Sequence, residues 1–204
     1  MKFTSTAAAA ACMAAVASAL PTENPIVPPS GNDMFRLMAL RSCTAIHYGN
    51  VQAQKGGLVI NSPQQNNKTC ENTSDGSIVS GVNYASFFLD SAGNLSLVTD
   101  NPTLEMYVDR SGMGQNVLRY TTGVQPISGN QERGPFKVND AGNLVFAAPT
   151  GDIGFQACPG ALGGGYSIWL AGVTNPGGNA GCVDFEMKAI KEDPAFKCLY
   201  DYGS

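Results

Sequence analysis

The stretch Val183-Asp-Phe-Glu-Met-Lys-Ala-Ile190 alternates between apolar and charged side chains. The two sets are Val183, Phe185, Met187 and Ala189 against Asp184, Glu186 and Lys188. Successive side chains of a β-strand point to opposite faces, so this period of two predicts a half-buried antiparallel strand. The same stretch would make a poor helix, because a helix needs apolar residues every three or four positions.

Eleven further runs of apolar and aromatic residues, separated by Gly, Asn, Asp and Pro, predict strands over most of the chain. They are Phe35–Leu40, Ala45–Tyr48, Leu58–Asn61, Ser86–Leu89, Leu95–Thr99, Leu104–Val108, Val117–Tyr120, Phe136–Val138, Leu144–Ala147, Gly154–Ala157 and Tyr166–Leu170. The composition agrees with this: the 204 residues include 24 Gly and 12 Pro, and only 14 % are charged, against about 25 % in typical soluble domains. We therefore expect an all-β protein with many short strands.

Two segments repeat one pattern. Phe88–Leu97 and Lys137–Phe146 both contain Ala-Gly-Asn-Leu between strand-like flanks, and Gly93 and Gly142 can supply the positive φ that a short hairpin loop requires. A fainter third copy lies at Gln54–Ile60. Three related hairpins among twelve strands predict a single compact antiparallel domain with a β-trefoil-like barrel. A β-sandwich of two sheets is the alternative.

The first 19 residues predict a cleavable signal peptide. Lys2 gives a positive start, Ala7–Val16 gives an apolar run, and Ala17-Ser-Ala19 is a small-residue cleavage site. The apolar run is shorter than the roughly 20 residues needed to span a bilayer. The tail Cys198–Ser204 lacks the hydrophobic stretch of a glycolipid anchor signal. We expect export, cleavage after Ala19 and no membrane span.

The mature chain then divides into a tether and one domain. Residues 20–34 hold four prolines, which favour an extended N-terminal segment, and residues 35–204 suffice for one all-β secreted domain. A net charge of −4 argues against nucleic acid as a partner, because phosphate binding needs a basic surface.

Five cysteines follow the predicted signal peptide: Cys43, Cys70, Cys158, Cys182 and Cys198. The secretory route is oxidising, so disulfides are expected. An odd number leaves at least one thiol over, or pairs it with another chain. Cys158 and Cys182 flank one predicted strand and the Gly-rich turn that follows it, so we expect these two to pair.

Residues 61–83 are mostly polar and predict a long surface excursion, which a disulfide at Cys70 would pin. This excursion holds two N-glycosylation acceptors, Asn67 and Asn72, and Asn94 is a third at a predicted hairpin tip. Three acceptors at loop positions of an exported chain predict a glycoprotein.

The sequence offers little catalytic chemistry. His47 is the single histidine, and no Gly-x-Ser-x-Gly or Cys-x-x-Cys motif accompanies it, which argues against nucleophilic catalysis and a zinc site. Arg110–Val117 contains Gly-x-Gly but lacks a third glycine and a following helix, so it predicts a turn. We expect no enzyme, catalytic residue, cofactor or metal. Tyr166 and Trp169, placed on one strand face, could contact sugar rings, although core packing is the simpler interpretation of Trp169.

The chain resembles the phiA cell wall protein family of filamentous fungi, a group that includes IgE-binding secreted antigens. The motifs that carry the resemblance are Phe35–Ser42 with Ile46-His47, Tyr107-Val-Asp-Arg-Ser-Gly-Met-Gly-Gln115 followed by Tyr120–Gly123, Phe155–Pro159, and Tyr166–Trp169 ahead of Cys182. Cys70, Cys158, Cys182 and Cys198 fall where that family's cysteines are expected, whereas Cys43 is additional. A looser similarity links the chain to the C-terminal domain of yeast wall proteins with internal repeats.

This resemblance implies an extracellular cell-wall glycoprotein with a part in phialide and conidium development. Its expected partners are wall polysaccharide or other wall proteins. One alternative function is a carbohydrate-binding, lectin-like module, and others are a secreted antigen or effector and a hydrolase built on two carboxylates.

Overall fold

The computed structural model describes residues 28–63 and 69–202. The predicted signal peptide, residues 20–27 of the predicted tether and the acceptor Asn67 lie outside these ranges.

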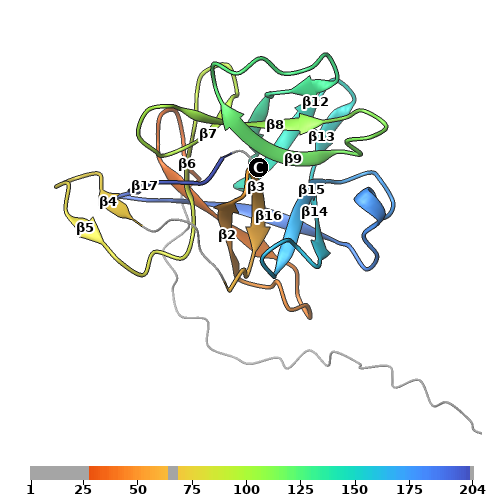
Figure 1. Cartoon of the computed structure of the whole chain (residues 1–204), viewed down its shortest axis with the longest axis horizontal. Coiled ribbons are helices and arrows are strands. Elements are labelled where there is room, and N and C mark those ends of the chain that lie inside the picture. Colours follow the sequence, from red (N-terminus) through yellow and green to blue (C-terminus); the bar gives the residue numbers. More distant parts are fainter. Residues whose placement is uncertain (1–27, 64–68, 203–204) are drawn as a thin grey trace, which may run out of the picture.

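The described chain consists of seventeen strands and one 3₁₀ turn, Pro176–Gly178, and it confirms the all-β class (Figure 1). The first nine strands are β1 (Phe35–Leu40), β2 (Gly49–Gln54), β3 (Gly57–Ile60), β4 (Cys70–Asn72), β5 (Ile78–Val79), β6 (Ser86–Leu89), β7 (Leu95–Leu97), β8 (Leu104–Asp109) and β9 (Val117–Thr122). The other eight are β10 (Gln131–Glu132), β11 (Phe136–Val138), β12 (Asn143–Ala148), β13 (Gly151–Ile153), β14 (Phe155–Pro159), β15 (Tyr166–Leu170), β16 (Val183–Lys191) and β17 (Phe196–Cys198). Fourteen strands share one antiparallel sheet, and β17, β4 and β5 form a second.

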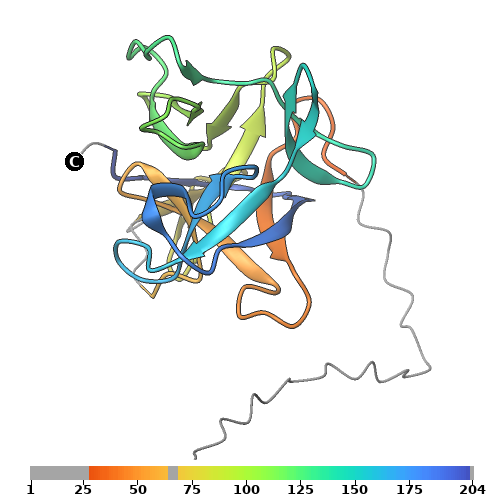
Figure 2. The same cartoon turned by 90° about the vertical axis from the view of Figure 1, so that its right-hand side faces the viewer.

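The alternating stretch is strand β16, as predicted. Its apolar residues Phe185, Met187 and Ala189 are buried, while the intervening charged side chains lie on the outer face. It pairs with β1 along the full length of β1, from Phe35 opposite Lys191 to Leu40 opposite Glu186, so the first and last long strands of the domain lie side by side (Figure 2).

Three hairpins meet at one end of the molecule. Strands β2–β3, β8–β9 and β14–β15 form these hairpins. The second strand of each hairpin pairs with the second strands of the other two: Gly57 faces Arg119, Val117 faces Trp169, and Tyr166 faces Ile60. These three contacts hold segments far apart in the sequence against one another.

The two Ala-Gly-Asn-Leu segments form equivalent turns, as the repeat predicts. Gly93 N donates to Asp90 O at 3.1 Å in the turn between β6 and β7, and Gly142 N donates to Asn139 O at 2.7 Å between β11 and β12. Both glycines have positive φ, 85° and 75°.

The fainter third copy is a different kind of hairpin. Strands β2 and β3 are joined by only Lys55 and Gly56, both at positive φ, a two-residue turn whose twist matches that of the strands. Strands β16 and β1 pair without a connecting turn, because they come from the two ends of the domain.

Phenylalanines fill the interior. Phe35 stacks on Phe87 with ring centroids 6.3 Å apart, and Phe136 meets Phe146 edge to face at 5.2 Å. All four are buried. Such aromatic pairs contribute about 0.5–1.5 kcal/mol each beyond the area they bury, so one pair ties β1 to β6 and the other ties β11 to β12.

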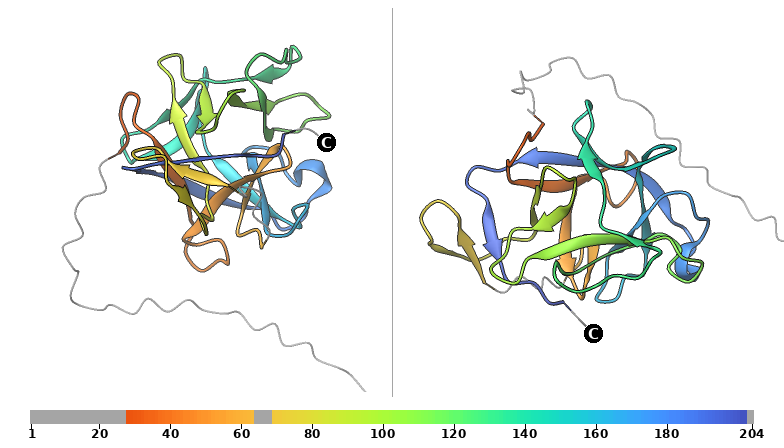
Figure 3. Two further views of the ribbon diagram at one scale, coloured as in Figure 1. Left: turned by 60° about the vertical axis from the view of Figure 1, so that its left-hand side comes forward. Right: turned by 90° about the horizontal axis from the view of Figure 1, so that it is seen from above.

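The strand expected at Ala45–Tyr48 was wrong. Residues 45–48 form turns, because His47 N and Gly49 N donate to carbonyls three residues back and Tyr48 has φ 61°. The polar segment 61–83 contains two short strands, β4 and β5, and β4 lies between β5 and β17 in the second sheet (Figure 3, right).

Candidate functional site

The end of the chain is fixed to this polar excursion by a disulfide. Cys70 in β4 and Cys198 in β17 are bonded and buried. Beside the bond, Lys197 pairs with Glu71 at 2.7 Å and with Asp100 at 2.9 Å. The disulfide that was expected at Cys70 therefore joins the polar segment 61–83 to the C-terminal strand β17.

A second disulfide joins Cys158 in β14 to Cys182 just before β16, the pairing expected from the sequence. Cys43, for which no partner was predicted, is disulfide-bonded as well. No free thiol is found in residues 28–63 and 69–202.

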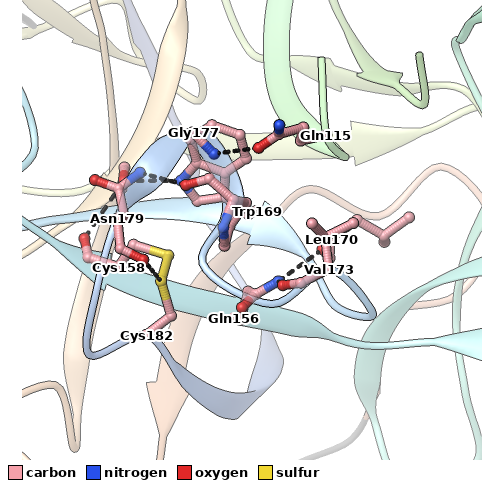
Figure 4. Close-up of a disulfide and its surroundings, with 11 residues drawn as sticks. Gln115, Gln156, Cys158, Trp169, Leu170, Val173, Gly177, Asn179 and Cys182 are labelled. Carbon is pink, nitrogen blue, oxygen red and sulfur yellow. Dashed lines mark hydrogen bonds between the residues drawn. A yellow bond between two sulfur atoms is a disulfide. The ribbon is translucent and has the colours of Figure 1, made fainter. Parts of the chain in front are cut away.

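Trp169 lies close to the second bridge, between it and the 3₁₀ turn (Figure 4). Its indole Nε1 donates to Ser167 Oγ at 2.9 Å. A Cβ on Gly177 would come within 2.8 Å of the indole ring, so the turn needs glycine here in order to lie against it. Trp169 is half-buried under this turn.

Tyr166 and Trp169 do not share a strand face, contrary to the expectation. They lie three residues apart in the continuous strand β15, and side chains of a strand alternate between faces, so an odd separation puts them on opposite sides. Tyr166 packs against the core cluster instead. The two rings therefore do not form one platform.

The motif Tyr107–Gln115 reaches the same region. Its loop connects β8 to β9, as the turn predicted for this segment requires. Gln115 Oε1 accepts a hydrogen bond from Gly177 N at 2.6 Å (Figure 4), and Asn116 Nδ2 donates to Ala171 O at 3.2 Å. The motif thus supports the turn over Trp169.

Asp109 holds this loop in shape. Its two carboxylate oxygens accept from Ser111 N and from Gln131 Nε2, each at 3.0 Å. Hydrogen bonds from the Ser111 and Gln131 side chains keep the pKa of Asp109 below its usual value. No side chain fits at Gly114, because a Cβ there would collide with the Asp109 carboxylate. Asp, Ser and Gly at these positions are therefore structural requirements.

A buried carboxyl lies between the two ends of the domain. Glu192 follows β16, and both of its carboxylate oxygens are buried. Burial raises the pKa of Glu192, and the nearby Ser86, Tyr84 and Arg36 offset part of this effect. Burial, followed by the charge of Glu192, raises the pKa of Tyr84 to about 12.

The acceptor asparagines that the structure describes differ in how they are held. Asn72 ends strand β4, and its Oδ1 accepts from Ser74 N at 2.8 Å while its Nδ2 makes no hydrogen bond to a described residue. Asn94 follows the turn at Gly93, and its Nδ2 donates to Asp90 Oδ2 at 2.8 Å. A glycan is attached at Nδ2, so Asn72 offers the less engaged atom of the two.

His47 lies in the turns after β1, and its Nδ1 accepts from Arg41 N at 3.0 Å. Within residues 28–63 and 69–202 no group of three or more His, Cys, Asp or Glu side chains could hold a metal ion. In the same ranges, no helix has the length and apolar character needed to span a bilayer.

The sequence analysis missed the roles of Gln115 and Glu192. Gln115 could have been noticed as the last residue of the most specific motif. Glu192 gave no signal, because it follows the alternating strand in a run of charged residues, Lys191 to Asp193, that is typical of solvent-exposed chain.

Comparison with known proteins gives a consistent result. The model of a family described as PhiA-like secreted protein matches residues 35–201. The chain is 38 % identical to "Cell wall protein phiA" of Emericella nidulans, over 98 % of this chain and 99 % of that one. It is 37 % identical to the protein of the same name from Aspergillus niger, over 92 % and 94 % of the two chains, and 33 % identical to that from Aspergillus fumigatus, over 94 % and 95 %. No solved structure matches the chain significantly.

Proposed function

The chain belongs to the PhiA-like secreted protein family, and from this we propose that this secreted cell-wall protein is a structural, non-catalytic wall glycoprotein with a part in phialide and conidium development. The observation that carries the proposal is the near full-length similarity to three relatives that are each named cell wall protein phiA. The developmental role rests on the resemblance alone.

The construction of the domain supports a passive role outside the cell. Both ends of the domain are held: β1 pairs with β16, and Cys198 is bonded to Cys70. Proteases cut exposed, poorly anchored chain, and within residues 35–63 and 69–198 the ends of the domain are anchored in this way. A domain of this kind persists in a wall without needing a catalytic centre.

We propose that Asn72 and Asn94 carry N-glycans, with Asn67 as a third acceptor. The uncommitted Nδ2 of Asn72 supports modification there. Mass measurement of the secreted protein before and after enzymatic glycan removal tests this, and an unchanged mass would exclude glycans at all three.

We also propose that the strands form a β-trefoil-like barrel. Five strand pairs support it: β1–β6, β6–β7, β11–β12, β12–β16 and β16–β1. Near the remaining junction, between β7 and β11, Phe136 N donates to Gly93 O at 2.7 Å. The three mutually paired hairpins β2–β3, β8–β9 and β14–β15 would then cap one end. A crystal structure with β7 and β11 splayed apart would favour the sandwich.

Fractionation of a culture tests the wall assignment. The medium, detergent-soluble, alkali-soluble and glucanase-released wall fractions are compared by mass spectrometry, and we expect the chain mainly in the wall fractions. In a strain that lacks the protein we expect fewer phialides and conidia, with normal hyphal growth. Recovery of the chain inside cells with reduced thiols would overturn the proposal.

The second candidate function is carbohydrate binding. Contact through Tyr166 and Trp169 remains a prediction, and the Trp169→Ala variant tests it. Loss of binding to chitin or β-glucan by a variant that is still folded would support it. Unchanged binding would remove Trp169 from the site.

A further inference from the structure

A groove of about 880 Å³ runs between the turns that follow β1 and the outer face of β16. The turns, residues 41–48, project at the bottom of Figure 2. They contribute Arg41, His47 and Tyr48, and β16 contributes Asp184, Glu186 and Lys188. Asp184 also lines a neighbouring hollow beside Cys182.

The turns are built to hold Tyr48 outward. Its N–H donates to Ala39 O at 2.8 Å, and its φ of 61° is one that residues with a Cβ rarely adopt. At the next position a Cβ on Gly49 would lie 2.5 Å from Ile60, so the chain can pass here only as glycine. Tyr48 is nevertheless 67 % exposed. A strained backbone that presents an exposed aromatic ring is a pattern found at binding sites.

His47 adds an oriented hydrogen-bond donor. Its ring centroid lies 4.0 Å from that of Tyr48, with the planes tilted by 36°. Because Nδ1 accepts the Arg41 N–H, the neutral ring carries its proton on Nε2. The nitrogen that remains available to the groove is therefore a donor.

The charges in the groove cancel. Arg41 and Lys188 are positive, and Asp184 and Glu186 are negative. Glu186 already accepts from Asn143 Nδ2 at 3.2 Å, and Lys188 donates to Ala141 O. The side chains of Arg41 and Asp184 make no hydrogen bond or ion pair with any described residue. The Arg41 guanidinium and the Asp184 carboxylate are planar groups that remain available for hydrogen bonds, and the site has no net charge. Such a site suits an uncharged ligand rich in hydroxyl groups.

We propose that this groove binds a neutral polysaccharide built of pyranose rings with equatorial hydroxyls, the chemistry shared by β-glucan and chitin. The flat face of Tyr48 would stack on the C–H face of one sugar, while Asp184, Arg41 and His47 would bond the hydroxyls of that ring and its neighbour. This inference rests on the proposed role in the wall, since it names the wall component that the protein would contact.

Calorimetric titration of the purified full-length secreted protein tests the groove. The probes are hexasaccharides of β-1,3-glucan and of chitin. The hexasaccharide that binds identifies the wall polymer. We expect Tyr48→Ala to weaken binding at least tenfold and Asp184→Asn to weaken it several-fold. Alanine also has a Cβ, so it adds no backbone penalty beyond the one tyrosine already carries. Thermal unfolding checks that each variant is folded.

The matched control is Tyr202→Ala, which removes another exposed tyrosine outside the groove and should bind as tightly as the original protein. Trp169→Ala separates the groove from the second candidate site, because loss of binding in that variant alone would assign the sugar to the region near the second bridge. The proposal is overturned if the original protein binds neither hexasaccharide at millimolar concentration, if Tyr48→Ala binds normally, or if Trp169→Ala alone abolishes binding. Wall fractionation of the original protein is a separate measurement. If the protein is found in the wall but its groove binds no sugar, the groove proposal fails while the proposed wall role stands.

Discussion

The Cys70–Cys198 and Cys158–Cys182 disulfides contribute differently to the fold, because they close loops of different length. Cys70 and Cys198 are 128 residues apart, whereas Cys158 and Cys182 are 24 apart. In the chain-entropy model, loops of these lengths correspond to stabilisation of about 5 and about 3.5 kcal/mol. The first bridge secures the end of the chain and hence the whole fold. The second shapes one surface, where it supports Trp169 and the turn above it.

Removal of the first bridge should have the largest effect. The double variant Cys70→Ser with Cys198→Ser should lose about 5 kcal/mol of unfolding free energy, since it frees β17 and the excursion that carries β4. Denaturant unfolding monitored by circular dichroism measures this. If this variant lost less unfolding free energy than the variant without the second bridge, the ranking of the two disulfides would be wrong.

Removal of the second bridge should cost less and act locally. Cys158→Ser with Cys182→Ser should lose about 3.5 kcal/mol. It should also shift the fluorescence of Trp169 to longer wavelength, because the 3₁₀ turn would no longer cover the indole. Trp169 is the single tryptophan of the chain, so the emission reports on this region alone. The first double variant, measured in its folded state, is the control and should keep the original spectrum.

The region between β16 and the first bridge should lose stability as the pH rises. Burial raises the pKa of Glu192 in the folded protein above its unfolded value. The folded state therefore binds this proton more tightly, and the stabilising contribution, complete below about pH 4.5, is lost as the pH rises through the folded pKa. Glu192→Gln mimics the protonated form, so it should raise Tm by about 2–4 °C at pH 7 and leave it unchanged at pH 4.

Glu132→Gln is the matched control for that measurement. Its carboxylate is exposed and pairs with Arg110 at 3.3 Å, and exposed ion pairs contribute little. A similar gain in Tm at pH 7 from both variants would mean that general charge reduction, and not the burial of Glu192, causes the effect.

The sequence predicted the strands whose apolar residues alternate with polar ones or lie between turn-forming residues. It missed β2, because Gln52 and Gln54 are buried there as polar residues that bond to Ser62. Nothing in the local pattern shows that a glutamine has a distant partner. It also read residues 45–48 as a strand, because apolar content does not reveal a positive φ at Tyr48.

The sites were less predictable, for a related reason. The Cys158–Cys182 pair is close in sequence and could be anticipated, whereas the partner of Cys70 depends on β17 folding back against β4. Tyr166 and Trp169 share a strand but not a face. The groove beside Tyr48 forms only where the turns after β1 meet β16, nearly 140 residues later, so no short motif encodes it.

The smallest expected effect concerns the link between the motif loop and the second bridge. Gln115→Ala removes the 2.6 Å hydrogen bond from Gly177 N, which should cost about 0.5–1 kcal/mol and speed hydrogen exchange of the Gly177 amide. Gln131→Ala breaks the bond to Asp109 on the other side of the same loop and should leave that amide unchanged. Equal exchange at Gly177 in both variants would mean that the turn over Trp169 is held by the disulfide alone. Faster exchange only in Gln115→Ala would show that the motif loop, together with the second bridge, holds the turn over Trp169.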